Sequence, residues 1–201
     1  MMPANRTTAM NRHIQRWAAS PSAAWLAIAT LAAFAFNQAA TVWLNASYAA
    51  SKYPVPYYVA QLSFSAEKIK GWYAAMLQTG TLDVYVRTQN IDFVFILSTL
   101  LLHFFALVLV SRAFREGSRG RTWMVACAFI SAIAPLADAS ENLVSYVMLA
   151  NPTTFADWLA VLYSSCSAIK FAFFCFAYLC VPVGLAAALG QRMTGRRAVL
   201  A

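Results

Sequence analysis

The chain has 201 residues, of which 61% are hydrophobic and 11% are charged, whereas soluble domains carry about 25% charged residues. Fifteen basic and seven acidic residues give a formal net charge of +8. This composition excludes an ordinary soluble domain. Because the bases flank apolar segments, they indicate orientation in a lipid bilayer and contact with anionic phospholipid at the cytoplasmic face, and no nucleic acid partner.

Four apolar segments predict an all-α membrane protein, a four-transmembrane-helix bundle that forms a single domain over residues 23–190. The spans are expected at about residues 23–48, 90–110, 123–149 and 158–189, and each exceeds the roughly 20 residues that cross the hydrocarbon core. A basic cytoplasmic arm, residues 1–22, precedes them, and a basic cytoplasmic tail, residues 191–201, follows. Pro182 predicts a kink or an interfacial last turn in span four.

The basic residues also predict the topology. Ten of the fourteen bases outside the spans lie in the arm, in the loop between spans two and three, and in the tail. The positive-inside rule therefore places both termini on the cytoplasmic side of the membrane. Residues 1–40 also imitate a secretory signal, but their apolar run exceeds the about 7–15 residues of a signal core, so we expect an uncleaved first span.

The connection between spans one and two predicts structure of its own. Residues 53–58 are rich in aromatics and prolines and predict an extended interfacial strip. An amphipathic helix is expected at residues 66–78 on the outer surface, with Ser65 as its cap, Glu67 in its first turn and Gly80 at its end. Two roles fit this helix, a lid over a cavity or a cover for the bundle.

Span three contains the most informative group of residues. Asp138, Glu141, Asn142 and Ser145 fall at i, i+3, i+4 and i+7, so they share one helical face. A charged side chain at the bilayer centre costs at least about 2.5 kcal/mol, and such residues usually face the protein interior and serve a site. One structural partner does not account for three adjacent polar groups, which favours a functional site.

The other spans carry matching polar stripes, which predict a bundle with the polar faces turned inward. The stripes are Asn37, Thr41, Asn45 and Tyr48 in span one; Tyr85, Gln89, Asp92, Thr99 and His103 in span two; and Tyr163, Cys166, Ser167 and Lys170 in span four. By the helical rise of ~1.5 Å per residue, Asp138 and Lys170 both lie near mid-membrane. We expect an ion pair between Lys170 and a carboxylate, and at least one acid that holds its proton at neutral pH.

The four cysteines form no C-x-x-C pair, and all lie within the expected spans: Cys127, Cys166, Cys175 and Cys180. This pattern argues against a thiol oxidoreductase and against a metal cluster. We therefore expect no metal and no cofactor.

These residues resemble a family of small bacterial four-helix membrane proteins of unknown function. The resemblance covers roughly residues 60–175 and rests on Gly80, Tyr85, Asp92, Phe95, Pro135, Asp138, Glu141, Asn142 and Lys170. Its motifs are Y-x6-D in span two and D-x-x-E-N in span three. More distantly, the arrangement is similar to the sterol-isomerase-like (EXPERA) bundles, which implies a cavity with intramembrane carboxylates that takes lipophilic amines and sterols.

Three functions fit the pattern. The first is a site that binds or acts on a lipophilic small molecule, with Asp138 or Glu141 as catalytic acid or carboxylate anchor, and a binding set of Asn142, Lys170, Asp92 and Tyr85. The second is proton- or ion-coupled transport through acidic relay groups, which would require a homo-oligomer because four spans are few for a carrier. The third is a structural subunit whose polar groups only fix the helix register. The sequence does not separate catalysis from binding.

Overall fold

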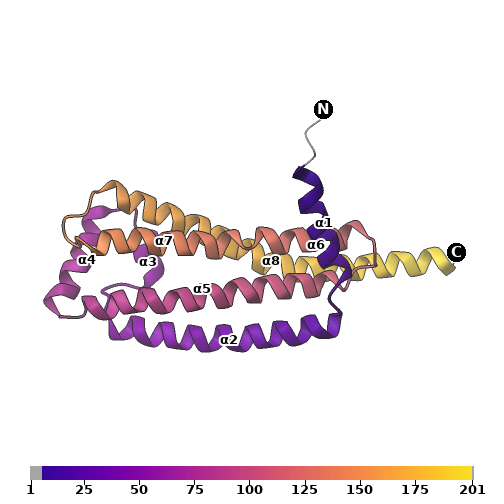
Figure 1. Cartoon of the computed structure of the whole chain (residues 1–201), viewed down its shortest axis with the longest axis horizontal. Coiled ribbons are helices and arrows are strands. Elements are labelled where there is room, and N and C mark those ends of the chain that lie inside the picture. The colour runs from indigo at the N-terminus through magenta and orange to yellow at the C-terminus, as the bar shows by residue number, and fades with distance from the viewer. Residues whose placement is uncertain (1–5, 201) are drawn as a thin grey trace. The chain divides into compact units, whose positions relative to one another are not determined.

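The computed structural model describes residues 6–200, with side chains described for residues 12–194. This part of the chain is helical, in the order α1 (Arg6–Ala19), α2 (Ala23–Ala50), α3 (Tyr57–Gln61), α4 (Ala66–Gln78), α5 (Leu82–Ser111), α6 (Arg119–Ile130), α7 (Ile133–Leu149) and α8 (Trp158–Leu200) (Figure 1). Four stretches are long and apolar enough to cross a membrane: Ala23–Ala50, Leu82–Ser111, Arg119–Leu149 and Trp158–Thr194. The predicted fold class, an all-α protein with four such spans, is confirmed.

The outward faces of these helices are apolar, the reverse of a soluble protein. On α2, large exposed side chains include Trp25, Ile28, Leu31, Phe34, Val42 and Trp43. Exposed apolar area on this scale marks a surface that meets lipid or another protein. The spans therefore imply contact with a lipid bilayer.

Several boundaries differ from those expected. Helix α5 begins at Leu82 rather than near residue 90, and residues 57–61, expected to be extended, form the short helix α3. The third span is two helices separated at residues 131–132, because Pro135 has no amide to donate to the Ser131 carbonyl and its ring crowds that carbonyl. Helix α8 continues through Pro182.

The described chain forms two compact units. Of the described residues, unit 1 contains 6–33, 101–132 and 175–200, and unit 2 contains 34–100 and 133–174. In unit 1, α1 packs against α6, and the core gathers Leu26, Leu107, Val108, Val110, Phe114, Met124, Ala128 and Ala188. Gly184 permits a close approach, since a Cβ there would lie 2.8 Å from Sδ of Met124.

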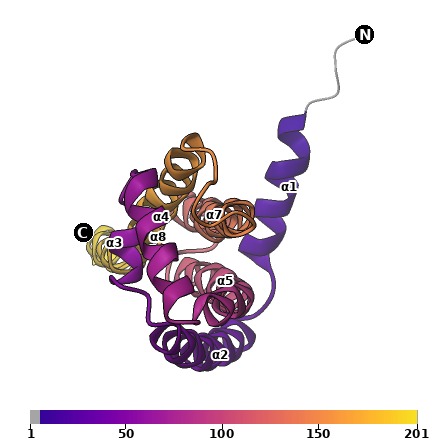
Figure 2. The same cartoon turned by 90° about the vertical axis from the view of Figure 1, so that its left-hand side faces the viewer.

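In unit 2, α4 crosses the end of the helices that carry the polar stripes (Figures 1 and 2). Ser65 caps this helix by accepting the Lys68 amide at 3.3 Å, and Gly80 follows its end with a φ of 66°. Its inner face, Ile69, Tyr73 and Met76, is fully buried, and these side chains share a core with Tyr85, Met148, Leu149, Phe155, Leu159, Ala160 and Tyr163. Helix α4 therefore closes one end of unit 2, with the bounds that the sequence predicted.

Candidate functional site

A buried lysine bridges two carboxylates in unit 2. Nζ of Lys170, on α8, lies 2.9 Å from Oδ1 of Asp138 and 2.6 Å from Oε2 of Glu141, both on α7. The two acids are three residues apart, so one face of α7 presents both to α8. The predicted ion pair is confirmed, and Lys170 has two acidic partners rather than one.

A second polar pair joins α5 to α7. Nδ2 of Asn142 donates a hydrogen bond of 2.7 Å to Oδ2 of Asp92. Asn142 follows Glu141 directly, so the same turn of α7 carries both the lysine partner and the Asp92 partner. The structure thus brings together five of the predicted site residues from three helices, and the exposed fraction of these residues lies between 0% and 8%.

Several polar atoms in and beside this group are buried without a hydrogen-bond partner. Among the described residues, Oδ1 of Asn142 and Nε2 of Gln89 have no hydrogen-bond partner. Gln89 precedes Asp92 by three residues on α5, so the two side chains leave the same face of that helix. A buried polar group without a partner costs about 1–3 kcal/mol, and such a group in a native structure calls for an explanation such as a bound ligand.

The charges in this cluster do not balance. Asp92, Asp138 and Glu141 supply three carboxyl groups, and Lys170 supplies one ammonium group. Full ionisation would leave two negative charges uncompensated in a dry interior, where an unpaired charge is very costly. The arrangement therefore suits the binding of a proton or of a ligand that donates hydrogen bonds.

Tyrosines fill the space between α4 and the acidic group. The ring centroid of Tyr85 lies 4.9 Å from that of Tyr53, 5.9 Å from that of Tyr73 and 6.3 Å from that of Tyr48. Tyr163 is buried in the same core. Tyr85, one of the predicted binding residues, therefore lies among aromatic rings.

Two of these tyrosines lie outside the spans and stay protonated. Burial raises the pKa of Tyr73 to about 12; the nearby Ser145 and Tyr85 hydroxyls oppose this rise, and the Glu141 carboxylate adds to it. Burial also raises the pKa of Tyr53 well above its ordinary value. Both phenols are therefore neutral hydrogen-bond donors over the physiological pH range.

Helix α4 and the residues just before it contact the region around the start of α8 at two points. Nζ of Lys70 lies 2.5 Å from Oδ1 of Asp157 and 5.0 Å from the centroid of the Phe155 ring. The amide of Phe64 donates to Oγ of Ser164 over 3.1 Å. Phe64 has a φ of 50°, a strained conformation for a bulky residue of the kind that collects at clamps and switch regions.

Not every predicted stripe residue joins the site. Asn45 is exposed, so the prediction that it faces inward is wrong. Asn37, in the same predicted stripe, is buried as expected, and its Nδ2 donates to Oγ of Ser98 and Oγ1 of Thr99. His103 belongs to unit 1, where its ring lies 5.0 Å from that of Tyr178.

The polar stripes predict that Tyr48, Tyr85 and Tyr163 face inward, but they predict neither the gathering of these rings with Tyr53 and Tyr73 nor the contact between Lys70 and Asp157. The spacing of aromatics along residues 48–85 was available as a signal, whereas nothing local links Lys70 to Asp157, 87 positions later. Within the described residues, no group of three or more His, Cys, Asp and Glu side chains is arranged to hold a metal ion.

Comparisons of this chain with protein-family models, with curated proteins and with solved structures find no match.

Proposed function

We propose that unit 2 binds a lipophilic small molecule whose polar end is a hydroxyl or an amine. The unpaired Oδ1 of Asn142 carries this proposal, because it requires a hydrogen-bond donor that the described residues do not supply. The excess of carboxyl groups over ammonium groups favours the same kind of polar end.

Each site residue has a role in this proposal. Asn142 orients the polar end, Asp92 positions Asn142 through their hydrogen bond, and Lys170 holds the two carboxyls of α7 in place. For turnover, such as a proton-triggered isomerisation, Asp138 or Glu141 transfers the proton. Binding without turnover uses the same residues, and the resemblance to EXPERA bundles implies the same class of ligand.

Helix α4 serves as a lid in this proposal. A groove of about 630 Å³ lies beside it, lined by Tyr58, Val59, Leu62, Ser63, Lys68 and Trp72. Its mixture of aromatic, aliphatic and polar side chains suits an amphipathic molecule at a membrane interface. Phe64 and Gly80, which both have positive φ angles, lie at the two ends of α4. In this proposal the backbone bends at these two residues when the lid opens.

The proposal places the protein in an inner membrane with both termini in the cytoplasm. Arginine distribution supports this orientation, since ten of the eleven arginines belong to unit 1 and Arg87 alone to unit 2.

A matched set of probes tests the site. The purified chain in detergent is titrated with a long-chain primary amine, the corresponding alcohol and the corresponding alkane, and the melting temperature is recorded. The amine or the alcohol should stabilise the chain, and the alkane should not. Asn142→Ala should abolish this stabilisation, whereas Ser140→Ala, on the exposed face of the same helix, should retain it.

Two results would contradict the proposal. Equal stabilisation by all three probes would show that only the apolar tail is recognised. Unchanged stabilisation of the Asn142→Ala variant would show that the polar end binds elsewhere, which would leave the acidic group a purely structural role.

A further inference from the structure

The charge of unit 1 is carried by one residue type. Its bases are ten arginines, with no lysine, and its only acid is Glu116. Guanidinium groups bind phosphate through two parallel hydrogen bonds, which an ammonium group does not provide. With ten arginines and one carboxylate, the sequence of unit 1 supplies too few acidic residues to pair with its guanidinium groups.

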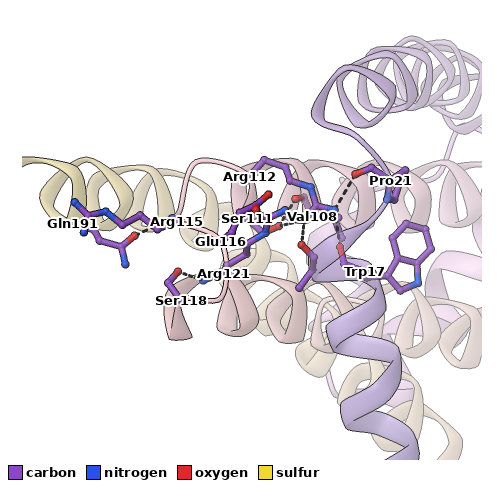
Figure 3. Close-up of polar contacts among 11 residues, drawn as sticks. Trp17, Pro21, Val108, Ser111, Arg112, Arg115, Glu116, Ser118, Arg121 and Gln191 are labelled. Atoms are coloured by element: carbon purple, nitrogen blue, oxygen red, sulfur yellow. Dashed lines mark hydrogen bonds and ion pairs between the residues drawn. The ribbon is translucent and has the colours of Figure 1, made fainter. Parts of the chain in front are cut away.

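Arg112 is already used by the fold. Its Nη1 donates to the carbonyl of Ala18 over 2.6 Å, and its Nη2 donates to those of Trp17 and Pro21 over 2.7 and 3.1 Å (Figure 3). These carbonyls lie at the end of α1 and the start of the following turn. Arg112 is therefore a structural clamp on the α1–α2 connection.

The guanidinium of Arg121 lies close enough to that of Arg112 to lower its pKa, and not all of the hydrogen-bond donors of Arg121 have a partner within the described residues. The side chain is buried, with 7% of the residue exposed, and its Nε has no hydrogen-bond partner among the described residues. Its Nη1 reaches Oε1 of Glu116 only at 3.5 Å, and 93% of the Glu116 side chain is exposed. Burial is the main cause that lowers the pKa of Arg112, and the charge of Arg121 adds to it, so the two guanidinium groups act on each other.

The start of α6 adds a second feature that favours an anion. Ser118 caps this helix and accepts the Arg121 amide at 3.3 Å, which leaves the amides before it at the positive end of the helix dipole. The exposed side chains of Arg115 and Arg119 lie on either side of Ser118 in the sequence. Glu116, the acidic partner of Arg121, has 93% of its side chain exposed, so it lies at the boundary between the buried guanidinium and the solvent (Figure 3).

We propose that Arg121 and the first turn of α6 bind a phosphate group, supplied by the headgroup of an anionic phospholipid at this face of the membrane. Glu116 occupies the edge of the site and is displaced when the phosphate enters. A phosphate offers several acceptor oxygens to the fork of Arg121, whereas Glu116 offers one distant oxygen. This site lies in unit 1 and does not depend on the function proposed for unit 2.

Two matched substitutions test the site without removing a charge. The full chain in detergent is titrated with phosphatidylglycerol, and the affinity is measured by native mass spectrometry. Arg121→Lys should weaken binding about tenfold, since the bidentate contact is lost. Arg119→Lys, the same substitution at an exposed position two residues earlier, should leave the affinity unchanged.

A third variant keeps the proposal testable if Arg121→Lys folds poorly. Glu116→Gln removes the competing carboxylate and should tighten binding about two- to fivefold. Phosphatidylcholine, which has no net charge, should bind more weakly than phosphatidylglycerol. If inorganic phosphate displaces phosphatidylglycerol from Arg121 at equal concentration, the phosphate site stands but its ligand is soluble.

The proposal is overturned by either of two outcomes. Equal losses for Arg121→Lys and Arg119→Lys would show that only the general positive charge of this face matters. A Glu116→Gln variant that is destabilised and binds no more tightly would show that Glu116 is a structural partner of Arg121 and no stand-in for phosphate.

Discussion

Replacing Lys170 by methionine should destabilise the protein strongly. The substitution keeps most of the side-chain volume and removes the ammonium group that lies 2.9 Å from Asp138 and 2.6 Å from Glu141. Removing one partner of a buried ion pair costs about 3–5 kcal/mol. Because two carboxylates lose the same cation, we expect the free energy of unfolding to fall by an amount at the upper end of this range.

Second substitutions should recover part of this loss. In Lys170→Met with Glu141→Gln, one carboxylate is still unpaired, and the same holds for Lys170→Met with Asp138→Asn. Each double variant should therefore recover some stability, and the triple variant, with neutral groups at all three positions, should recover most of it. The measurement is unfolding in detergent at neutral pH, monitored by circular dichroism.

The chain provides a matched control in unit 2. Lys70 pairs with Asp157 over 2.5 Å, but 25% of the Lys70 side chain and 80% of the Asp157 side chain are exposed. Lys70→Met should therefore cost no more than about 1 kcal/mol. Equal effects of Lys70→Met and Lys170→Met would refute the reasoning, as would a triple variant whose losses simply add, because uncoupled groups give additive losses.

Two further predictions concern α4 and the orientation of the chain. The pKa of Tyr73, about 12 against 10.0 for a free phenol, means that the unfolded chain gives up this proton first; the stability due to Tyr73 is complete below pH 10 and is lost as the pH rises to 12. Denaturant titrations should show this fall, and Tyr73→Phe should reduce it by about 3 kcal/mol at most. Cysteines placed at Ser118 and Thr153 should be labelled from opposite sides of the membrane, and labelling from the same side would contradict the topology inferred from the arginines.

The sequence predicts those parts of the fold that depend on local chemistry. Ser65 and Gly80 mark the ends of α4, and the structure has this helix at the expected residues. The pairing of Lys170 with the acids of α7 follows from depth alone, because a buried lysine in lipid needs a carboxylate at the same level. The first prediction depends only on residues at the ends of one helix, and the second depends only on the depth of each residue in the membrane.

The sequence does not predict how each helix is rotated about its own axis, nor which segments far apart in the chain come into contact. The polar pattern of α2 places Asn37 and Asn45 on one face, yet only Asn37 is buried. The two partners of Lys170 differ by less than one helical turn, so periodicity does not distinguish one carboxylate from the other. The clamp made by Arg112 looks in the sequence like any other loop arginine, because its acceptors are backbone carbonyls more than 90 positions away.

The fastening of α4 by Lys70 and Asp157 has a consequence for how the protein responds to its surroundings. Dissolved salt screens exposed charges over a Debye length of about 8 Å at physiological ionic strength, and it screens buried pairs much less. Salt therefore weakens the exposed ion pair between Lys70 of α4 and Asp157. It has little effect on the buried ion pairs of Lys170 with Asp138 and Glu141. The ionic strength of the solution beside α4 thus changes how firmly α4 is attached to unit 2, while the buried ion pairs inside unit 2 are little affected.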